Sequence, residues 1–321
     1  MRFVTYRKGN RVRLGAVVRD QVVDLQKLLQ AHGGQTGQGA GAARGFPADL
    51  LTLIEQQGQW LEPVRAALSW AEQAAASGEK GWAGKRGVAF PLKRTELLAP
   101  IPRPTKNIVM LGRNYREHAI EGARARGETP NIPTIPVYFT KPRTAVIGHR
   151  APILYWKNTE KLDYEAELAF VIGREGRNIS QAEAYDYIFG YTIINDVTAR
   201  DLQRAHGGQW FKGKSLDTFC PMGPWLVHKS AIPDPHNLRI TLRVNGEPRQ
   251  DSNTQHMIFD IPTIIADLSN GLTLEVGDIV STGTPEGVGF AMTPPGLLKV
   301  GDKVEVEIEG IGLLANEVVS P

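Results

Sequence analysis

Three acidic residues stand at the ends of two apolar segments, and their spacing points to a metal site. Glu165 and Glu167 lie one residue apart at the start of an apolar run that extends to Ile172. Asp196 directly follows a second apolar run, 187–195. Because side chains alternate between the two faces of a β-strand, Glu165 and Glu167 project to the same side. Unpaired charge beside an apolar core is costly, so we expect a cation to meet the three carboxylates.

The donor atoms favour a hard divalent cation. All three candidate ligands are carboxylates, and no cluster of cysteine and histidine lies nearby in the sequence, so Mg²⁺ fits better than zinc. Mn²⁺ or Ca²⁺ could occupy the same oxygen site. Three ligands leave coordination positions open for water or substrate, which is typical of a catalytic ion. The alternative is an amphipathic strand with a solvated acidic face, a pattern that the sequence shows at 304–309.

A histidine upstream supplies a candidate general base. His118 and Glu121 are three residues apart, so on a helix they share a face and the carboxylate can orient the imidazole. Such a pair is also common as a simple surface contact. The segment 123–136 contains three prolines and predicts an irregular loop that could close over a site. Within it, Arg124 and Arg126 could bind a distal carboxylate of the substrate, or could be solvated.

Further polar residues follow Asp196 and suggest contacts with substrate oxygens. Arg200 could clamp a carboxylate in two-point fashion, Gln203 could bind an oxygen, and Lys214 could neutralise an enolate or carboxylate. Taken singly, each could equally be a solvated surface residue. The segment 277–289 reads as a strand that runs into a glycine-rich loop whose amides and hydroxyls could hold an anion. It lacks the Gly-Lys-Ser/Thr ending of a P-loop, so a nucleotide is not indicated.

Four ordered motifs identify a family that this chain resembles. They are GRNYREHAIE at 112–121, DYEAELAFVIG at 163–173 with NDVTARDLQ at 195–203, FKGKSLDTFCPMGPW at 211–225, and GDIVSTGTPEGVG at 277–289. From about residue 98 to the C-terminus the chain is similar to the fumarylacetoacetate hydrolase superfamily. The resemblance implies a β-rich α+β protein, with a mixed β-roll catalytic domain at 98–321 and a smaller α/β N-terminal lobe at 1–97.

The resemblance also implies a role for each candidate residue. In this family an equivalent pair of glutamates and a later aspartate bind Mg²⁺ or Mn²⁺, which assigns the ligands to Glu165, Glu167 and Asp196. The implied catalytic residues are His118, Glu121 and Lys214, and the implied substrate-binding residues are Arg200, Gln203, Thr284 and Tyr115. No acid lies between Lys106 and Arg116, so the chain resembles the three-carboxylate branch of the family, which includes acylpyruvate hydrolases.

The predicted activity is hydrolysis of the carbon–carbon bond of a 2,4-dioxo acid, such as acetylpyruvate or the fumarylpyruvate of aromatic catabolism. His118, oriented by Glu121, would activate water for attack at C4, and pyruvate would leave as an enolate whose charge the metal and Lys214 stabilise. The alternative reactions on the same scaffold are isomerisation of an unsaturated 2-oxo dicarboxylic acid and decarboxylation of oxaloacetate. A third possibility is a non-enzymatic protein with a structural metal.

Composition excludes several other classes of protein. The 321 residues can bury a large core, and the net charge of +3 comes from scattered Lys and Arg that form no nucleic-acid-binding stripe. No apolar run is long enough to cross a membrane, and charges interrupt the N-terminus, so we expect a cytoplasmic enzyme. The only cysteine, Cys220, permits no intrachain disulfide and has the apolar neighbours of a buried thiol. The family implies a homodimer that acts on a small 2-oxo acid.

Periodicity and turn residues assign the remaining segments. In the N-terminal lobe, 31–45 is a low-complexity, mobile segment without evident chemistry, and the regular elements are strands at 3–6 and 14–18 and helices at 50–57 and 60–76. In the second half, Asn245-Gly246 predicts a hairpin turn. Asp260 precedes a short helix that begins near Pro262 and ends at Asn270-Gly271.

Overall fold

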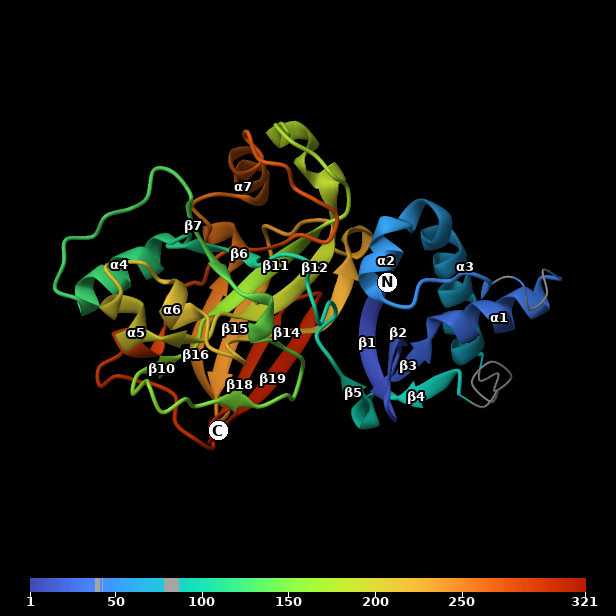
Figure 1. Ribbon diagram of the computed structural model, residues 1–321, viewed down its shortest axis with the longest axis horizontal. Helices are drawn as coiled ribbons and strands as arrows, with labels where there is room; N and C mark the ends of the chain where they lie inside the picture. Colours follow the sequence, from blue (N-terminus) through green and yellow to red (C-terminus); the bar gives the residue numbers. More distant parts are fainter. Residues whose placement is uncertain (38–40, 42, 78–86) are drawn as a thin grey trace.

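The computed structural model describes residues 1–37, 41, 43–77 and 87–321, and its fold is the predicted strand-rich α+β type. The molecule is elongated, with the N-terminal lobe at one end of its long axis (Figure 1). Helices α4 (Arg116–Ala125) and α5 (Arg200–Ala205) lie at the opposite end. The candidate residues around these helices are therefore remote from the N-terminal lobe.

The N-terminal lobe is a small antiparallel sheet with helices packed on one face. Its elements are β1 (Arg2–Lys8), β2 (Arg11–Val18), β3 (Gln21–Asp24), β4 (Ala89–Pro91), β5 (Glu96–Leu97), α1 (Leu25–Gln35), α2 (Leu50–Glu55) and α3 (Gln57–Ala76). The predicted strands and helices are confirmed, with small shifts at their ends. Apolar residues of α1 and α3, such as Leu28 and Val64, pack on Phe3 and Leu14 of the sheet.

The prediction for the low-complexity segment 31–45 is wrong at its start, which is helical as far as Gln35. Asp24 caps α1 by accepting a hydrogen bond from a first-turn amide, and Leu28 anchors the helix in the core. This packing outweighs the low helix propensity of the glycines near its C-terminus. Residues 38–40 and 42 of the predicted segment lie outside the described residues.

One long sheet runs through both parts of the chain, because β1 pairs with β14 (Cys220–His228). The strand order is β4-β3-β2-β1-β14-β12-β11-β17-β6-β7, with β5 beside β1 and β8 beside β14. The other strands of this sheet are β6 (Ile108–Gly112), β7 (Val137–Lys141), β8 (Val146–Ile147), β11 (Ala166–Ile172), β12 (Ile188–Asn195) and β17 (Ile279–Ser281). The division into domains at residue 97 stays a prediction.

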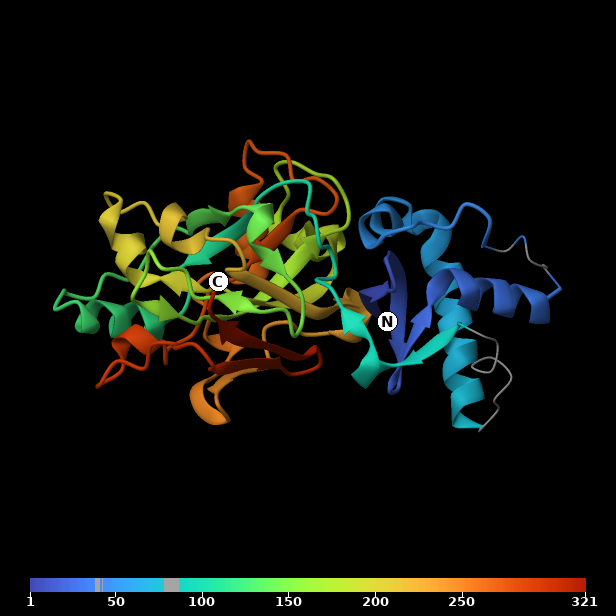
Figure 2. The same cartoon turned by 60° about the horizontal axis from the view of Figure 1, so that its bottom comes forward.

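A second sheet of five strands packs against the long sheet (Figure 2). Its order is β16-β15-β18-β19-β9, and its strands are β9 (Ile153–Leu154), β15 (Arg239–Val244), β16 (Glu247–Asn253), β18 (Lys303–Ile308) and β19 (Gly312–Val319). The predicted Asn245-Gly246 turn joins β15 to β16, with both residues at positive φ (55° and 83°). Phe170, Leu242 and Val306 meet in the core between the sheets.

Short elements complete the catalytic part. They are the strand pair β10 (Leu162–Asp163) and β13 (Thr198–Ala199), and the helices α6 (Phe211–Lys214) and α7 (Ile261–Leu268). The predicted cap of α7 is confirmed, because the Asp260 side chain accepts a hydrogen bond from the Thr263 amide. Cys220 is a free, buried thiol, and burial raises its pKa to about 12. No helix in the described part of the chain is long and apolar enough to cross a membrane.

Candidate active site

Strand pairing brings the three predicted metal ligands together. Ala166 of β11 lies opposite Asn195 of β12, so the glutamates on either side of Ala166 face the aspartate that follows Asn195. The backbone amide of Asp196 donates a hydrogen bond to the Glu165 carbonyl at 2.8 Å, which extends the pairing of β11 and β12 by one residue. One carboxylate oxygen from each of Glu165, Glu167 and Asp196 lies within 4.8 Å of the others, and all three residues are buried. The solvated-strand alternative is wrong for this pair, although it describes β18, where valines are buried and Glu307 is exposed.

The carboxylates fit a divalent cation. Glu167 Oε2 accepts hydrogen bonds from the Ser281 hydroxyl and from the Gly283 amide, whereas Glu167 Oε1 is buried without a partner among the described residues. Burial and the neighbouring Asp196 and Glu165 raise the pKa of Glu167 well above its usual value. A buried acid with a free oxygen that faces two other acids is a suitable ligand for a hard ion such as Mg²⁺.

Two buried lysines also contact the three candidate carboxylates. Lys214 Nζ lies 2.7 Å from both Glu165 Oε2 and Asp196 Oδ2, and Lys141 Nζ contacts the other oxygen of Asp196. Burial alone would lower the pKa of Lys214, but Asp196 and Glu165 raise it, so this lysine keeps its charge. Lys141 was not predicted. Its only signal in the sequence is a lysine at the end of a strand, just before Pro142.

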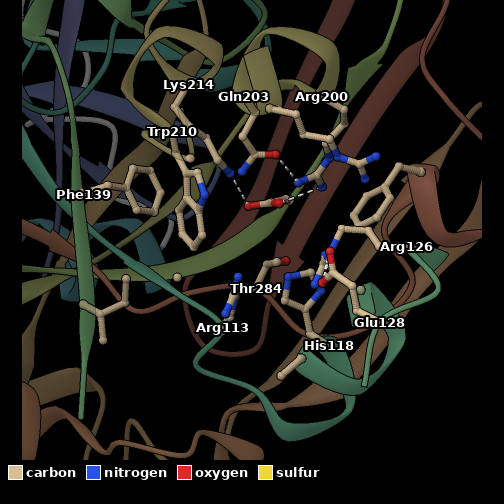
Figure 3. Close-up of a pocket in the computed structure, with 18 residues that line it drawn as sticks. Arg113, His118, Arg126, Glu128, Phe139, Arg200, Gln203, Trp210, Lys214 and Thr284 are labelled. Carbon is tan, nitrogen blue, oxygen red and sulfur yellow. Dashed lines mark hydrogen bonds and ion pairs between the residues drawn. The ribbon is translucent and has the colours of Figure 1, made fainter. Parts of the chain in front are cut away.

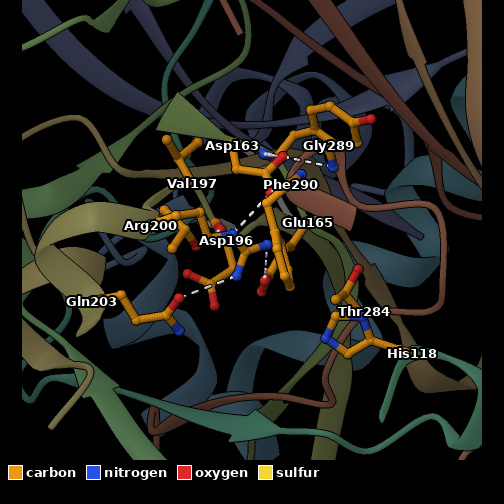
Figure 4. Close-up of polar contacts among 12 residues, drawn as sticks. His118, Asp163, Glu165, Asp196, Val197, Arg200, Gln203, Thr284, Gly289 and Phe290 are labelled. Carbon is orange, nitrogen blue, oxygen red and sulfur yellow. Dashed lines mark hydrogen bonds and ion pairs between the residues drawn. The ribbon is translucent and has the colours of Figure 1, made fainter. Parts of the chain in front are cut away.

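Arg200 is part of a buried ionic network rather than a free clamp for substrate (Figure 4). Its Nε lies 2.8 Å from Asp163 Oδ2 and its Nη2 lies 2.7 Å from Glu165 Oε1, while Nη1 donates to Gln203 Oε1 at 3.3 Å. Asp163 in turn accepts hydrogen bonds from the Gly289 and Phe290 amides. Arg200 therefore reaches the site through Glu165, and the unpredicted Asp163 fixes its orientation.

The predicted His118–Glu121 pair forms on α4, as the helical spacing requires. His118 Nδ1 lies 3.7 Å from Glu121 Oε2, which is too long for a hydrogen bond but close enough for electrostatic orientation. Glu121 is held by the Gly287 amide, which donates to its carboxylate at 3.0 Å. The glycine-rich loop does bind anions, since its amides hold carboxylates of the protein itself, namely Glu167, Glu121 and Asp163.

A cavity of about 250 Å³ opens beside these residues (Figure 3). Of the predicted site residues, it is lined by His118, Glu165, Arg200, Gln203, Lys214 and Thr284. The lining residues that were not predicted for the site include Arg113, Phe139, Arg204 and Phe290. The cavity thus joins the histidine of α4 to the metal-binding strand, across a wall that carries more cations than acids.

Four predicted site residues stand behind the wall of the cavity. Glu121 lies close to the lining residue His118, and Asp196 pairs with the lining residue Lys214. A carboxylate oxygen of Glu167 lies within 4.8 Å of one of the lining residue Glu165. Tyr115 is completely buried, and its hydroxyl lacks a hydrogen-bond partner within the described part of the chain. Burial is the main cause of the raised pKa of Tyr115, followed by the charges of Glu167 and Glu286. Its predicted contact with substrate stays a prediction.

A family model described as fumarylacetoacetate (FAA) hydrolase C-terminal matches residues 107–319. The chain belongs to the fumarylacetoacetate hydrolase family. One relative, named oxaloacetate tautomerase YisK, from Bacillus subtilis strain 168, is 44% identical over 99% of this chain and 100% of its own length. A solved fumarylacetoacetate hydrolase from Exiguobacterium antarcticum is 36% identical, with a TM-score of 0.76 over the whole of both chains.

A third relative in the fumarylacetoacetate hydrolase family is an isomerase. The structure described as 2-hydroxyhepta-2,4-diene-1,7-dioate isomerase from Mycobacterium marinum is 31% identical, with a TM-score of 0.68 over 100% of this chain and 98% of that chain. The family confirms that the chain is related to enzymes and confirms the recognition of the family in the sequence.

The predicted hydrolase reaction on an acylpyruvate is contradicted by the name of the relative that matches nearly the full length of the chain, an oxaloacetate tautomerase. The predicted role in aromatic catabolism depended on the hydrolase reaction and is no longer supported. The physical reason for the error is that His118 and Glu121 can move a proton on carbon as readily as they can activate water. The motifs for the metal and the base therefore fit either hydrolysis or a proton shift on carbon. The relatives support the predicted alternative, a reaction of a 2-oxo dicarboxylic acid without hydrolysis, better than the hydrolase prediction.

Proposed function

We propose that this protein is a divalent-metal-dependent tautomerase that interconverts the keto and enol forms of oxaloacetate. The observation that carries the proposal is the cavity, because it connects a buried three-carboxylate metal site to one imidazole, that of His118, among the described lining residues. A 1,3-proton shift needs a base at carbon and stabilisation of charge at oxygen, and it needs no activated water. The full-length similarity to a protein named oxaloacetate tautomerase supports the same choice.

The metal would be held by Glu165, Glu167 and Asp196, and when bound it would supply Lewis-acid polarisation of the 2-oxo group. Mg²⁺ is the ion we propose, with Mn²⁺ or Ca²⁺ able to use the same oxygen ligands. Lys214 and Lys141 offset part of the charge of Glu165 and Asp196. Glu167, whose pKa is raised, would release its proton when the ion binds.

His118 would remove a proton from C3 of the keto acid. The electron pair of that C–H bond forms the C2=C3 double bond, and the 2-oxo oxygen takes the negative charge. Lys214 lines the cavity and would stabilise that charge with its ammonium group. Transfer of a proton to the oxygen, from the His118 imidazolium or from water, gives the enol, and His118 returns to its neutral form by giving its proton to that oxygen or to solvent. Glu121, fixed by the Gly287 amide, would stabilise the imidazolium that forms on His118.

The wall of the cavity suits a substrate with two carboxylates. Arg126, predicted to bind the distal carboxylate, instead pairs with Glu128 at 2.7 Å, and Arg124 is exposed and does not line the cavity. Arg113 makes no hydrogen bond or ion pair with any described residue, and its guanidinium lies 5.6 Å from the centre of the Trp210 ring. A guanidinium held against an aromatic wall without a carboxylate partner is suited to bind one from the substrate.

Replacing Arg113 by asparagine should lower kcat/KM for oxaloacetate on the order of tenfold, mainly through KM. Asparagine tolerates the left-handed backbone of this position, where φ is 56°, so the fold should be kept. The rate with phenylpyruvate, which has one carboxylate, should change less than about twofold. Steady-state kinetics with both substrates test this, and Arg116→Asn on the exposed start of α4 is the matched control. Equal losses with both acids would remove Arg113 from recognition of the distal carboxylate.

The function itself is tested by following the ultraviolet absorbance of enol-oxaloacetate with metal-stripped protein, before and after Mg²⁺ or Mn²⁺ is added. We expect metal-restored acceleration of the keto–enol exchange, with no release of pyruvate from oxaloacetate or acetylpyruvate beyond the uncatalysed rate. Pyruvate release from oxaloacetate at the rate of the exchange would identify a decarboxylase instead. An exchange rate equal to that of buffer would reject the tautomerase.

The second candidate is isomerisation of an unsaturated 2-oxo dicarboxylic acid, which the name of the Mycobacterium marinum relative favours. It requires the same base and the same stabilised oxygen, with the proton delivered to a more distant carbon. A faster rate with a dienedioate than with oxaloacetate would select it. A homodimer and a cytoplasmic location remain proposals from the sequence, which sedimentation and fractionation would test.

A further inference from the structure

Gln250 is a buried polar residue outside the catalytic motifs. It lies on β16, the edge strand of the five-stranded sheet, and only 1% of its surface is exposed. Its side chain leaves that sheet and reaches the first residues of β11 and the glycine-rich loop. From the second sheet, Gln250 thus contacts both β11 and the cavity wall.

The two ends of the Gln250 amide are fixed independently. Oε1 accepts a hydrogen bond from the Ala166 amide at 2.9 Å, and a backbone N–H can only donate. Nε2 donates to the Pro285 carbonyl at 2.8 Å, and a carbonyl can only accept. Exchanging oxygen and nitrogen would place two acceptors together and two donors together. The orientation of the amide therefore does not depend on the third contact, with Thr284.

The orientation of the Gln250 amide determines on which side the Thr284 hydroxyl accepts a hydrogen bond and on which side it can donate one. Nε2 of Gln250 also donates to Thr284 Oγ1 at 2.9 Å, so the hydroxyl oxygen acts as the acceptor on that side. Its hydrogen makes no hydrogen bond to a described residue, and Thr284 lines the cavity with only 2% of its surface exposed. Figures 3 and 4 both draw Thr284 next to His118. The hydrogen of the hydroxyl is left to point away from Gln250, toward the cavity.

We infer that Gln250 is a positioning residue that makes Thr284 a hydrogen-bond donor to an oxygen of the bound 2-oxo acid. This rests on the proposed function of the site. The substrate is an anion whose oxygens all accept, so a threonine turned the other way would present lone pairs to it and repel it. Because the same glutamine holds the amide between Glu165 and Glu167, it also sets the distance between the donor and the metal-binding strand.

The test is a double-mutant cycle with Thr284→Val and Gln250→Glu in the full-length, Mg²⁺-loaded protein. A carboxylate at 250 still accepts from Ala166, but it would accept from the Thr284 hydroxyl and turn its hydrogen away from the cavity. Thr284→Val alone should reduce kcat/KM on the order of tenfold, as expected for a hydrogen bond to a charged group. In the Gln250→Glu background, Thr284→Val should reduce kcat/KM by less than about twofold.

Binding of oxalate by calorimetry is the second readout of the cycle, since oxalate is a dianion with only acceptor oxygens and needs no turnover. The same non-additivity is expected in its Kd. If the wild type bound oxalate but did not exchange oxaloacetate, the proposed function would fail while the inference on Gln250 stood. If Thr284→Val changed kcat/KM or the Kd for oxalate by the same factor in the wild type and in Gln250→Glu, the inference would be overturned and Gln250 would be only a structural residue.

Two further variants serve as a control and as a replacement. Gln255→Glu makes the same chemical change at an exposed position close to the end of β16 and should leave both readouts at wild-type values. Should Gln250→Glu fail to fold, Gln250→Met, of similar length and without a donor, replaces it. The fold-loss of kcat/KM caused by Thr284→Val should then be at least about threefold smaller than in the wild type, because the hydroxyl loses its preferred direction. An unchanged cost in the methionine background would contradict the inference.

Discussion

Replacing His118 by asparagine should lower kcat for oxaloacetate tautomerisation on the order of 10²- to 10⁴-fold, the usual contribution of a positioned general base. This imidazole lines the cavity and is the base of the proposed mechanism, and it makes no hydrogen bond to the three carboxylates. The affinity for Mg²⁺ should therefore stay close to that of the wild type. Turnover in the enol assay and Mg²⁺ binding by calorimetry measure the two quantities separately.

A control on the same helix makes this result specific. Glu117→Gln alters the exposed residue next to His118 and should change neither turnover nor metal binding. Glu121→Gln should give an intermediate loss, because the Gly287 amide can still hold the side chain while the negative charge beside the imidazole is gone. Full turnover by His118→Asn would mean that another group moves the proton, and the proposed mechanism would have to be abandoned.

Changing Glu167 to glutamine should raise the Kd for Mg²⁺ more than about 100-fold, beyond the 10- to 100-fold typical of losing an outer partner of a ligand. The substitution removes one ligand charge from a site that holds three acids within 4.8 Å of one another. The stabilisation of the folded protein by added Mg²⁺ should disappear with it, because that stabilisation depends on the ratio of metal concentration to Kd.

Melting curves with and without Mg²⁺ distinguish loss of the metal from loss of the fold. Metal-free Glu167→Gln should be at least as stable as metal-free wild type, because glutamine carries no charge, whereas Glu167 can ionise only by burying a charge beside Glu165 and Asp196. Glu307→Gln, on the exposed face of β18, is the matched control and should keep the full effect of Mg²⁺. Normal metal binding by Glu167→Gln would rule out its assignment as a ligand.

The clustering of the three candidate metal ligands could be predicted because their positions depend on local rules. Strand alternation puts Glu165 and Glu167 on one side, and the end of an apolar run puts Asp196 at a strand terminus. The hairpin at Asn245-Gly246 and the cap at Asp260 follow equally local turn and capping chemistry. Helical spacing likewise predicted that His118 and Glu121 share a face of α4.

The polar partners of the site depended on contacts between distant segments. Lys141 reaches Asp196 from β7, Asp163 orients Arg200 across a gap of 37 residues, and Gln250 reaches Ala166 across 84. Nothing in the immediate sequence of a lysine, an aspartate or a glutamine distinguishes such a contact from a solvated side chain. The pairing of Arg126 with Glu128, two residues further along the chain, was not predicted either.

The sequence by itself determined the family, the strand-rich fold and the three carboxylates, because each of these is encoded in motifs and short-range periodicity. The tertiary structure alone decided which cations neutralise those carboxylates, that Arg113 lines the cavity without a carboxylate partner among the described residues, and how Thr284 is turned. These depend on packing two sheets so that β16, β11 and the glycine-rich loop meet. The proposed metal ligands and base would serve hydrolysis and tautomerisation alike, so only the named relatives favoured one reaction over the other.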